Sequence, residues 1–208
     1  MRIAVIGSGN VGSGLATVLS KAGFEVIIGA RDVAKTTDIA KGLGPNISVA
    51  TVKEAADKVR ILFLAVPYAE AASALVQAGD LKDKVIVDVT NPLRPDYMGL
   101  TLGHTTSAAE EIQKRVPGAR VVKAFNTVFA QIYTAGPRIH GTAVPVFIAG
   151  DDEAATREVD RIAAAAGFAP IIVGALELAR YLEPLAGLNI VLGYGRGWGT
   201  AIAPMWLK

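Results

Sequence analysis

The sequence predicts an α/β fold that contains a mainly parallel sheet of about eight strands and ends in a C-terminal helical extension. Three observations lead to this prediction. Short apolar runs alternate with segments of helical spacing, a glycine pattern directly follows the first apolar run, and the chain from Leu176 onward has helical spacing without strands. Alternation of this kind is typical of a doubly wound, Rossmann-type sheet that helices cover on both faces.

The first apolar run leads into the sequence Gly7-Ser8-Gly9-Asn10-Val11-Gly12 and then into a segment of helical spacing. In such a strand–loop–helix, Gly7 permits a tight turn, Gly9 lets the backbone approach a pyrophosphate, and Gly12 lets the helix pack close to the strand. The helix start would offer free N–H groups and a partial positive charge to the phosphates. We therefore expect residues 7–12 to bind a dinucleotide; a glycine-rich turn without a ligand is the alternative.

Further apolar runs are expected to form the other strands. The run at 60–66 is apolar almost throughout, as expected for a central parallel strand buried on both faces. Thr51 and Ser107 each precede a glutamate by three residues, which is the spacing of a capping box at a helix start. The expected strands are 2–6, 25–29, 47–50, 60–66, 84–89, 120–124, 145–150 and 169–173, and the expected helices include 38–43, 68–78, one from Ser107 to near Pro117, and one from Asp151 or Asp152 to Ala166.

The composition narrows the class of protein. The chain has 208 residues, of which 51% are hydrophobic and 19% are charged, and its formal net charge is +2. This net charge is too small to indicate the basic surface that binds a nucleic acid. No stretch of roughly 18 apolar residues is present to span a membrane. Cysteine is absent, which excludes disulfides, thiol catalysis and cysteine-bound zinc, and we expect no metal site. We expect a cytoplasmic protein with a dinucleotide-binding domain at 1–174 and an extension at 175–208.

The extension differs in composition from the rest of the chain. It holds both tryptophans, Trp198 and Trp206, and its glycines alternate at 193, 195, 197 and 199. Since glycine costs about 1 kcal/mol in a helix interior, this series indicates close backbone contact with a ligand or a second chain, or a break in the helix. The extension could simply cover the core of the sheet. We expect the extension to form the contact of a homodimer. We also expect it to form one wall of the pocket for the second substrate, which accepts a hydride from the dinucleotide.

The end of the second strand indicates which dinucleotide binds. An NAD site has an acidic residue there that binds the ribose 2′-OH, whereas an NADP site has an arginine near the 2′-phosphate. Here Ala30 stands at the position expected for the acidic residue, and Arg31 follows it directly. Lys35 lies one turn further on, and Ser8 adds a hydroxyl from the glycine loop. Hydrogen bonds to charged groups contribute roughly 1.5–3 kcal/mol, or about 10- to 150-fold in affinity. We expect NADP(H); Asp32 is the argument for NAD, and a solvated surface charge is the alternative role of Arg31.

The carboxyl ends of three central strands are apolar, with isolated amides and hydroxyls. This environment suits a flat nicotinamide ring near Ala65, Val66 and Pro67. The carboxamide of the ring would then form a hydrogen bond with Asn91 or Asn126. A turn or a helix cap is the alternative role for each asparagine.

No side chain is expected to act as a general acid or base. The two histidines, His104 and His140, lie in segments expected to be surface loops. Lys123 ends a buried strand and could donate a proton, but a structural ion pair is the favoured role. A dinucleotide site without a strong acid or base suits hydride transfer to a second cofactor, because the cofactors then carry the chemistry and the protein positions them.

Six segments in order carry a resemblance to a known family. They are Ile3 to Gly12, Gly29 to Asp32, Ala65 to Pro67, Thr90 to Pro92, Val121 to Thr127 and Tyr181 to Gly197. Over nearly its whole length the chain resembles the coenzyme F420-dependent NADP reductase family. The K-A-F-N-T and L-E-P segments are the more particular of these, since unrelated enzymes share the glycine loop.

The resemblance implies hydride exchange between NADP(H) and the deazaflavin coenzyme F420. It also implies that Ser8, Arg31 and Lys35 bind the 2′-phosphate. The family usually has a serine or threonine where this chain has Ala30, so one hydroxyl donor is missing, which should cost about 1 kcal/mol and soften the preference for NADP. The family is also similar to the reductase domains of membrane ferric reductases, which pass hydride to a flavin, so a flavin is a second candidate acceptor.

Two other functions stay open. The first is an NADPH-dependent reductase of a small carbonyl or imine, which would need a proton donor. The second is a non-enzymatic NADP(H)-binding sensor, whose partner surface would be the tryptophan-rich extension. The residues that could donate a proton to a carbonyl or imine are Lys123, His104, Tyr68 and Tyr97.

Overall fold

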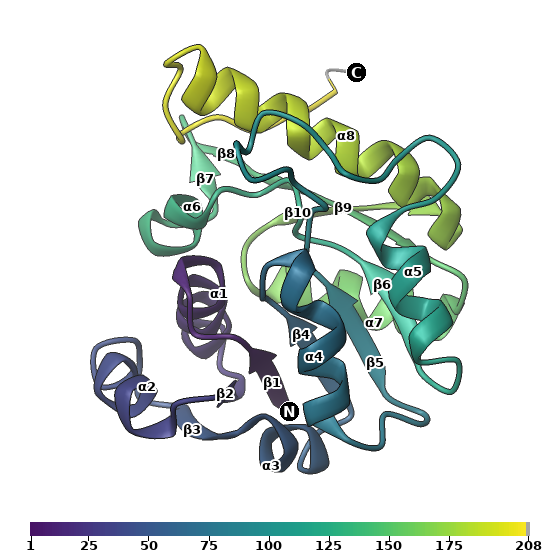
Figure 1. Ribbon diagram of the computed structural model, residues 1–208. Coiled ribbons are helices and arrows are strands. Elements are labelled where there is room, and N and C mark those ends of the chain that lie inside the picture. Colours follow the sequence, from purple (N-terminus) through teal and green to yellow (C-terminus); the bar gives the residue numbers. More distant parts are fainter. Residues whose placement is uncertain (207–208) are drawn as a thin grey trace.

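The computed structural model describes residues 1–206 and contains an eight-stranded sheet between two layers of helices (Figure 1). Neighbouring strands of this sheet are parallel except for one antiparallel pair, β6 and β9. The predicted α/β fold with a mainly parallel sheet is therefore confirmed. In spatial order the strands are β3 (Ile47–Thr51), β2 (Glu25–Ala30), β1 (Arg2–Ile6), β4 (Ile61–Leu64), β5 (Val85–Asp88), β6 (Arg120–Lys123), β9 (Pro145–Gly150) and β10 (Ala169–Gly174).

The path of the chain across the sheet changes direction at β1. Ile6, the last residue of β1, pairs with Gly29 of β2 on one side and with Leu64 of β4 on the other. The chain builds β2 and β3 on the first side before it returns to build β4 on the second. In doubly wound sheets the ligand binds at such a point, outside the carboxyl ends of the strands.

Apolar side chains of the helices bury both faces of the sheet. Leu15 and Tyr133 belong to the core on one face, and Leu75 and Ile112 belong to the core on the other face. The helices are α1 (Asn10–Lys21), α2 (Val33–Ala40), α3 (Val52–Asp57), α4 (Tyr68–Ala78), α5 (Ala108–Arg115), α6 (Ala130–Ala135), α7 (Glu153–Ala165) and α8 (Ala179–Ile190).

The start of α2 differs from the prediction of a helix over 38–43. It begins at Val33, because Asp32 is its N-cap and Oδ1 of Asp32 accepts a hydrogen bond from the Lys35 amide at 2.9 Å. At α7 the capping residue is Asp152, not Asp151, and its Oδ1 accepts from the Ala155 amide at 2.8 Å. N-cap carboxylates satisfy amides that have no partner within the helix.

The two expected capping boxes have different outcomes. At Thr51 the reciprocal contacts with Glu54 are both present, so this capping box is confirmed. At Ser107 only one half forms, because its hydroxyl accepts from the Glu110 amide while the Glu110 carboxylate binds Arg180.

The connection from β6 to β9 contains elements that the sequence did not predict. They are α6 and a small hairpin of β7 (Arg138–Ile139) and β8 (Thr142–Ala143). After the hairpin, β9 runs antiparallel to β6 rather than parallel to it. The apolar run at 145–150 predicts a buried strand, but a buried strand has the same composition in either direction, so the sequence did not indicate the reversal.

The extension is helical over only part of its length. A 3₁₀ turn (Leu176–Leu178), α8 and a π-helical turn (Val191–Gly195) follow one another, and the chain from 196 to 206 is irregular. Gly197 and Gly199 have φ angles of +71° and +78°, so these glycines mark a break in the helix. The predicted extension continues to Lys208, but 207–208 lie outside the described residues. Within residues 1–206, no helix has both the length and the apolar character needed to cross a membrane.

Candidate functional site

A cavity of about 460 Å³ lies at the carboxyl ends of β1, β2 and β4. The glycine loop forms one side of this cavity, and one face of α4 forms another. Of the thirteen residues predicted to bind the cofactor, eight line it: Gly7, Ser8, Gly9, Arg31, Lys35, Ala65, Val66 and Pro67. We refer to it as the glycine-loop cavity.

The glycine loop has the geometry that a dinucleotide needs. A Cβ atom on Gly12 would lie 2.1 Å from the carbonyl oxygen of Gly7, and one on Gly7, where φ is +111°, would lie 2.5 Å from the carbonyl oxygen of Ala65. A Cβ atom on Gly9 would have no neighbour within 4 Å. Gly7 and Gly12 therefore hold α1 against the sheet, and Gly9 faces open space. Because no side chain caps α1 at Gly9, its first amides are available to an anion.

Asn10 and Val11, the other predicted residues of the loop, form the first turn of α1. Neither side chain lines the glycine-loop cavity. Asn10 is exposed, and Val11 packs partly against the core. Any contact from these two residues to a ligand would therefore come from the backbone at the helix start.

Basic side chains gather where β2 leads into α2. Arg31 and Lys35 line the glycine-loop cavity together with Ser8, whose Oγ accepts a hydrogen bond from Thr36 at 3.2 Å. The Asp32 carboxylate, which was the argument for NAD, is bound to the amide of Lys35 as a helix cap. The Arg31 guanidinium lies 3.2 Å from the carboxylate of Glu70, on α4.

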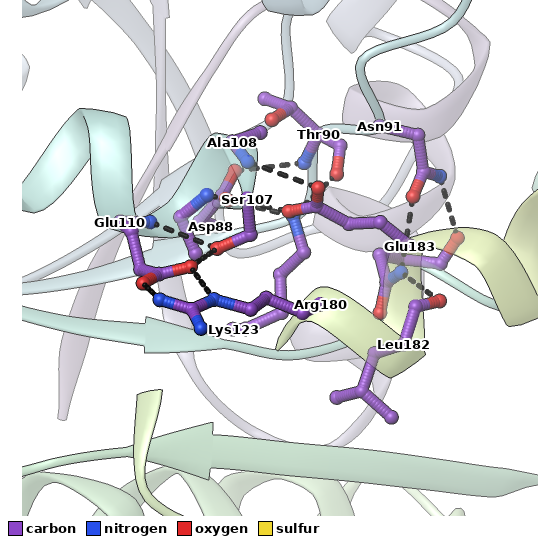
Figure 2. Close-up of polar contacts among 12 residues, drawn as sticks. Asp88, Thr90, Asn91, Ser107, Ala108, Glu110, Lys123, Arg180, Leu182 and Glu183 are labelled. Carbon is purple, nitrogen blue, oxygen red and sulfur yellow. Dashed lines mark hydrogen bonds and ion pairs between the residues drawn. The ribbon is translucent and has the colours of Figure 1, made fainter. Parts of the chain in front are cut away.

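Asn91 and Asn126 lie together, but neither lines the glycine-loop cavity. Asn91 Nδ2 donates to the carbonyl oxygen of Asn126 at 2.8 Å, and Asn126 Nδ2 donates to Asn91 Oδ1 at 3.0 Å and to the Leu182 carbonyl at 2.9 Å. Figure 2 shows these bonds as dashed lines that run from Asn91 toward Leu182 of α8. These bonds join the loops that follow β5 and β6 to the extension. Asn126 Oδ1 is buried and has no hydrogen-bond partner among the described residues.

A buried cluster of charges lies where β5 and β6 end, against α8 and the start of α5 (Figure 2). Lys123 Nζ is 2.7 Å from Asp88 and 2.8 Å from Glu183, and it donates to the Thr90 carbonyl at 2.6 Å. Glu183 also accepts from the amides of Ala108 and Ala109, at the start of α5. All three charged side chains are fully buried. The structural ion pair predicted for Lys123 is confirmed.

Burial and the neighbouring charges shift the pKa values of Lys123 and Glu183. Burial alone would lower the pKa of the Lys123 ammonium, but the charges of Asp88 and Glu183 outweigh burial and raise it. Burial raises the pKa of the Glu183 carboxyl, against the opposite effect of Lys123 and the Ala108 amide. Sequence reasoning missed the role of Glu183; a lone glutamate in the apolar Leu182-Glu183-Pro184 segment was the available signal.

None of the remaining candidate proton donors lines the glycine-loop cavity. His104 and His140 are exposed loop residues, as predicted, and Tyr97 is exposed as well. Burial raises the pKa of the partly buried Tyr68, with the charge of Glu111 as a further cause, so its hydroxyl is a weaker acid than an ordinary tyrosine.

The extension forms an apolar groove with the β7–β8 turn. This groove, of about 360 Å³, lies between α8 and the irregular segment that follows it. Leu188 and Trp198 line it and are 56% and 63% exposed. Trp206, which is 69% exposed, packs edge-on against Phe147.

The sheet topology, the glycine loop and the cavity beside it together define a dinucleotide-binding protein of the Rossmann type. The model of the family described as NADP oxidoreductase, coenzyme F420-dependent, matches residues 2–92. The F420-dependent NADP reductase of Methanothermobacter marburgensis is 32% identical over 210 residues, and the match covers 92% of each chain. The chain belongs to this family of F420-dependent NADP reductases.

Three other similarities extend the comparison. Rat metalloreductase STEAP3 is 35% identical over 185 residues, which cover 88% of this chain and 36% of that protein. The chain thus spans about a third of the length of the metalloreductases that it matches. A crystal structure from Arthrobacter sp. FB24, provisionally assigned as an F420-dependent NADP reductase, has a TM-score of 0.88 and 30% identity, with full coverage of both chains. An imine reductase from Aspergillus terreus shares the fold, with a TM-score of 0.69 and 19% identity.

Proposed function

We propose that this chain transfers a hydride between NADP(H) and a second redox cofactor, either coenzyme F420 or a flavin. One observation carries the proposal: Arg31 and Lys35 line the same cavity as the open side of the glycine loop. In that cavity the glycine loop would bind the pyrophosphate of a dinucleotide, and the two basic side chains would bind its 2′-phosphate. The names of the relatives support F420, and the similarity to the metalloreductases keeps a flavin as the second candidate.

Each predicted site residue then has a role in binding or positioning. Residues 7–12 would hold the pyrophosphate through backbone amides at the start of α1. Ser8, Arg31 and Lys35 would bind the 2′-phosphate. Ala65, Val66 and Pro67 would form the apolar side of the site, and Asn91 and Asn126 would hold the end of the cofactor that carries the nicotinamide.

We propose that Asn126 makes a specific contact with the nicotinamide end of the cofactor. Its two amide hydrogens are bound to Asn91 and Leu182, while its Oδ1 is buried without a partner among the described residues. A buried acceptor of this kind is costly unless a donor reaches it. The amide group of a nicotinamide would supply that donor, and the ring supplies the hydride when it is bound.

The chain itself would orient the reactants rather than transfer protons. Lys123 forms ion pairs with two carboxylates, and neither histidine lines the glycine-loop cavity. We therefore expect His104→Ala and His140→Ala each to leave turnover within about threefold of the parent, because general acid–base catalysis typically contributes 10²–10⁴-fold. A loss of about 10³-fold in either variant would instead favour the reductase of a small carbonyl or imine.

The test of the function is an acceptor assay. Oxidation of NADPH and NADH would be followed by absorbance with F420, FMN and a panel of carbonyl and imine compounds as acceptors. We expect turnover with F420 or FMN, and with NADPH in preference to NADH. Turnover with only the carbonyl or imine compounds would contradict the proposal, and tight NADPH binding without turnover on any acceptor would identify a sensor.

We further propose that the chain acts as a cytoplasmic homodimer. We also propose that the chain divides into a dinucleotide-binding part at 1–174 and an extension at 175–208. The exposure of Trp198 and Trp206 and the apolar groove that Trp198 lines support a dimer contact through the extension. The absence of cysteine fits a reducing compartment. In the dimer the extension would also wall the acceptor pocket.

A further inference from the structure

The carboxylate of Glu70 faces the basic end of the glycine-loop cavity from the opposite wall. Arg31 Nη1 lies 3.2 Å from Glu70 Oε2. The two residues are 39 positions apart, on the turn after β2 and in the first turn of α4, and both line the cavity. The ion pair therefore connects the two walls of the cavity at the place proposed for the 2′-phosphate.

The face of α4 that carries Glu70 forms much of this wall. Ser73, Ala74 and Gln77 follow Glu70 at helical spacing and line the same cavity. Two carboxylates line it, Glu70 and Asp32, and the Asp32 carboxylate is held by the Lys35 amide. Glu70 is therefore the acidic side chain that contacts the cation expected to bind the phosphate.

We propose that Glu70 sets the affinity and specificity of the site for NADP(H) by competing with the 2′-phosphate for Arg31. This inference rests on the proposed assignment of NADP(H). A 2′-phosphate bound to Arg31 would compete with the Glu70 carboxylate for the guanidinium, and the two negative groups would then lie near each other. NADH carries no 2′-phosphate, so its binding does not require this exchange.

The exchange is easy because the pair is exposed to solvent. The Arg31 and Glu70 side chains are 73% and 48% exposed, and ion pairs of this kind contribute little to stability. A phosphate can replace the carboxylate with stronger, bidentate hydrogen bonds to the guanidinium. Glu70 thus tunes binding and does not block the site.

The test compares Glu70→Gln with a matched control. Asp57→Asn removes one negative charge from the end of α3, where Asp57 pairs with Lys53 and does not line the cavity. We expect Glu70→Gln to tighten NADPH binding about 2- to 5-fold, the range given by an exposed ion pair. NADH binding should change less than about 2-fold, and Asp57→Asn should change neither. Calorimetric titration with NADPH and NADH measures all of these constants.

Competition between Glu70 and the 2′-phosphate also predicts how Glu70→Gln acts together with Arg31→Ala and with added salt. In an Arg31→Ala background, Glu70→Gln should no longer change NADPH affinity, because the cation for which the carboxylate competes is gone. In about 1 M salt the effect of Glu70→Gln should shrink, since the screening length is then about 3 Å. A merely structural role of Glu70 in the first turn of α4 would change thermal stability without changing the ratio of NADPH to NADH affinity.

Several outcomes would overturn the inference. Weaker or unchanged NADPH binding in Glu70→Gln would do so, as would equal tightening of NADPH and NADH, or equal tightening in Asp57→Asn. Failure of the underlying assignment has a different signature. If Arg31→Ala weakens NADPH and NADH equally, Arg31 does not bind the 2′-phosphate and both proposals fail. If Arg31→Ala is selective and Glu70→Gln is neutral, the cofactor assignment stands and only the role of Glu70 fails.

Discussion

Gly12 shows how a single missing side chain sets the geometry of the site. A Cβ there would lie 2.1 Å from the Gly7 carbonyl oxygen, so Gly12→Ala must push α1 away from the loop. Overpacking of this kind costs about 1–3 kcal/mol, occasionally more. We expect Gly12→Ala to lower the free energy of unfolding by about 1–3 kcal/mol or more, as measured by chemical denaturation.

Gly9 provides the matched comparison. Its φ of −73° suits any residue, and a Cβ would meet nothing within 4 Å. Gly9→Ala should therefore keep the stability of the parent. Its methyl group would occupy the space offered to the pyrophosphate, and we expect NADPH to bind about tenfold more weakly, the equivalent of one good hydrogen bond. A stable Gly12→Ala, or a Gly9→Ala with unchanged NADPH affinity, would contradict this account of the loop.

A further prediction for a single residue concerns Arg31 and the choice between NADPH and NADH. We expect Arg31→Ala to weaken NADPH binding by about tenfold or more while NADH binding changes little, because charge-assisted hydrogen bonds to the phosphate are lost. Titration of both nucleotides with the same protein sample measures the difference. The sequence indicated Arg31 from its place after the second strand, but it did not indicate Glu70, because an ion pair across 39 residues depends on how α4 packs.

At the scale of elements, the buried charges tie together strands and helices that are far apart in sequence. Lys123 of β6 binds Asp88 of β5 and Glu183 of α8, all fully buried. Lys123→Met would leave two carboxylates buried without their cation. We expect it to lower the free energy of unfolding by about 3–5 kcal/mol.

Glu183→Gln disrupts the same cluster of buried charges less than Lys123→Met does. It leaves Lys123 paired with Asp88 and keeps an amide oxygen near the start of α5. We expect a smaller loss of stability than in Lys123→Met, as measured by denaturant titration at pH 7. A loss below about 1 kcal/mol for Lys123→Met, the range of an exposed pair, would show that the cluster does not stabilise the fold.

A second contact between α5 and α8 should depend on pH. The Glu110 carboxylate binds Arg180 at 2.6 and 2.9 Å. Burial alone would raise the pKa of Glu110, but the hydrogen bonds from Arg180 and Ser107 lower it below the ordinary value of 4.5. A lowered pKa in the folded state means that the contribution to stability is present above pH 4.5 and is lost as the pH falls below it.

The measurement is thermal unfolding between pH 3 and pH 6, a range around the ordinary pKa of a glutamate. Glu110→Gln should have a flatter profile than the parent below pH 4.5. In an Arg180→Met background the same substitution should change the profile less, because its main partner is absent. Parallel profiles of the parent and Glu110→Gln would show that this contact carries no pH dependence.

Elements with strong local signals were predicted well, and elements set by packing were not. The apolar run at 60–66 and the Thr51 capping box predicted β4 and the start of α3 from local chemistry alone. α6 and the β7–β8 hairpin are too short to show periodicity, and the reversal of β9 depends on where the hairpin returns the chain. In the same way, the asparagines were identified as polar groups at the sheet edge, but their bonds to each other and to Leu182 depend on the position of α8.

For the whole molecule, the exposed apolar surface of the extension predicts self-association. Leu188 and Trp198 are largely exposed beside the groove, and a patch of large apolar side chains usually marks an interface. We expect light scattering to give twice the mass of the chain. Leu188→Ser and Trp198→Ser together should shift the protein to a monomer.

Val76 supplies the control for this test. It lies on α4, outside the extension, and is 82% exposed. Val76→Ser should leave the mass unchanged. Substitution is a cleaner test than truncation, because removal of α8 would also remove Glu183 from the buried charges. A monomeric parent, or a dimer that survives the double substitution, would contradict the prediction.

The buried bond from Glu183 to α5 also has a consequence for the order in which the molecule is assembled. Glu183 lies 75 positions after Ala108, and α8 lies after every strand of the sheet, so the ribosome makes it later than all of them. A nascent chain that ends before α8 already contains the glycine loop and Arg31, but Asn126 has no Leu182 carbonyl to bind and the start of α5 has no carboxylate. During synthesis, the glycine loop and Arg31 should therefore be in place before α8 can fix Asn126 for its proposed contact with the nicotinamide end.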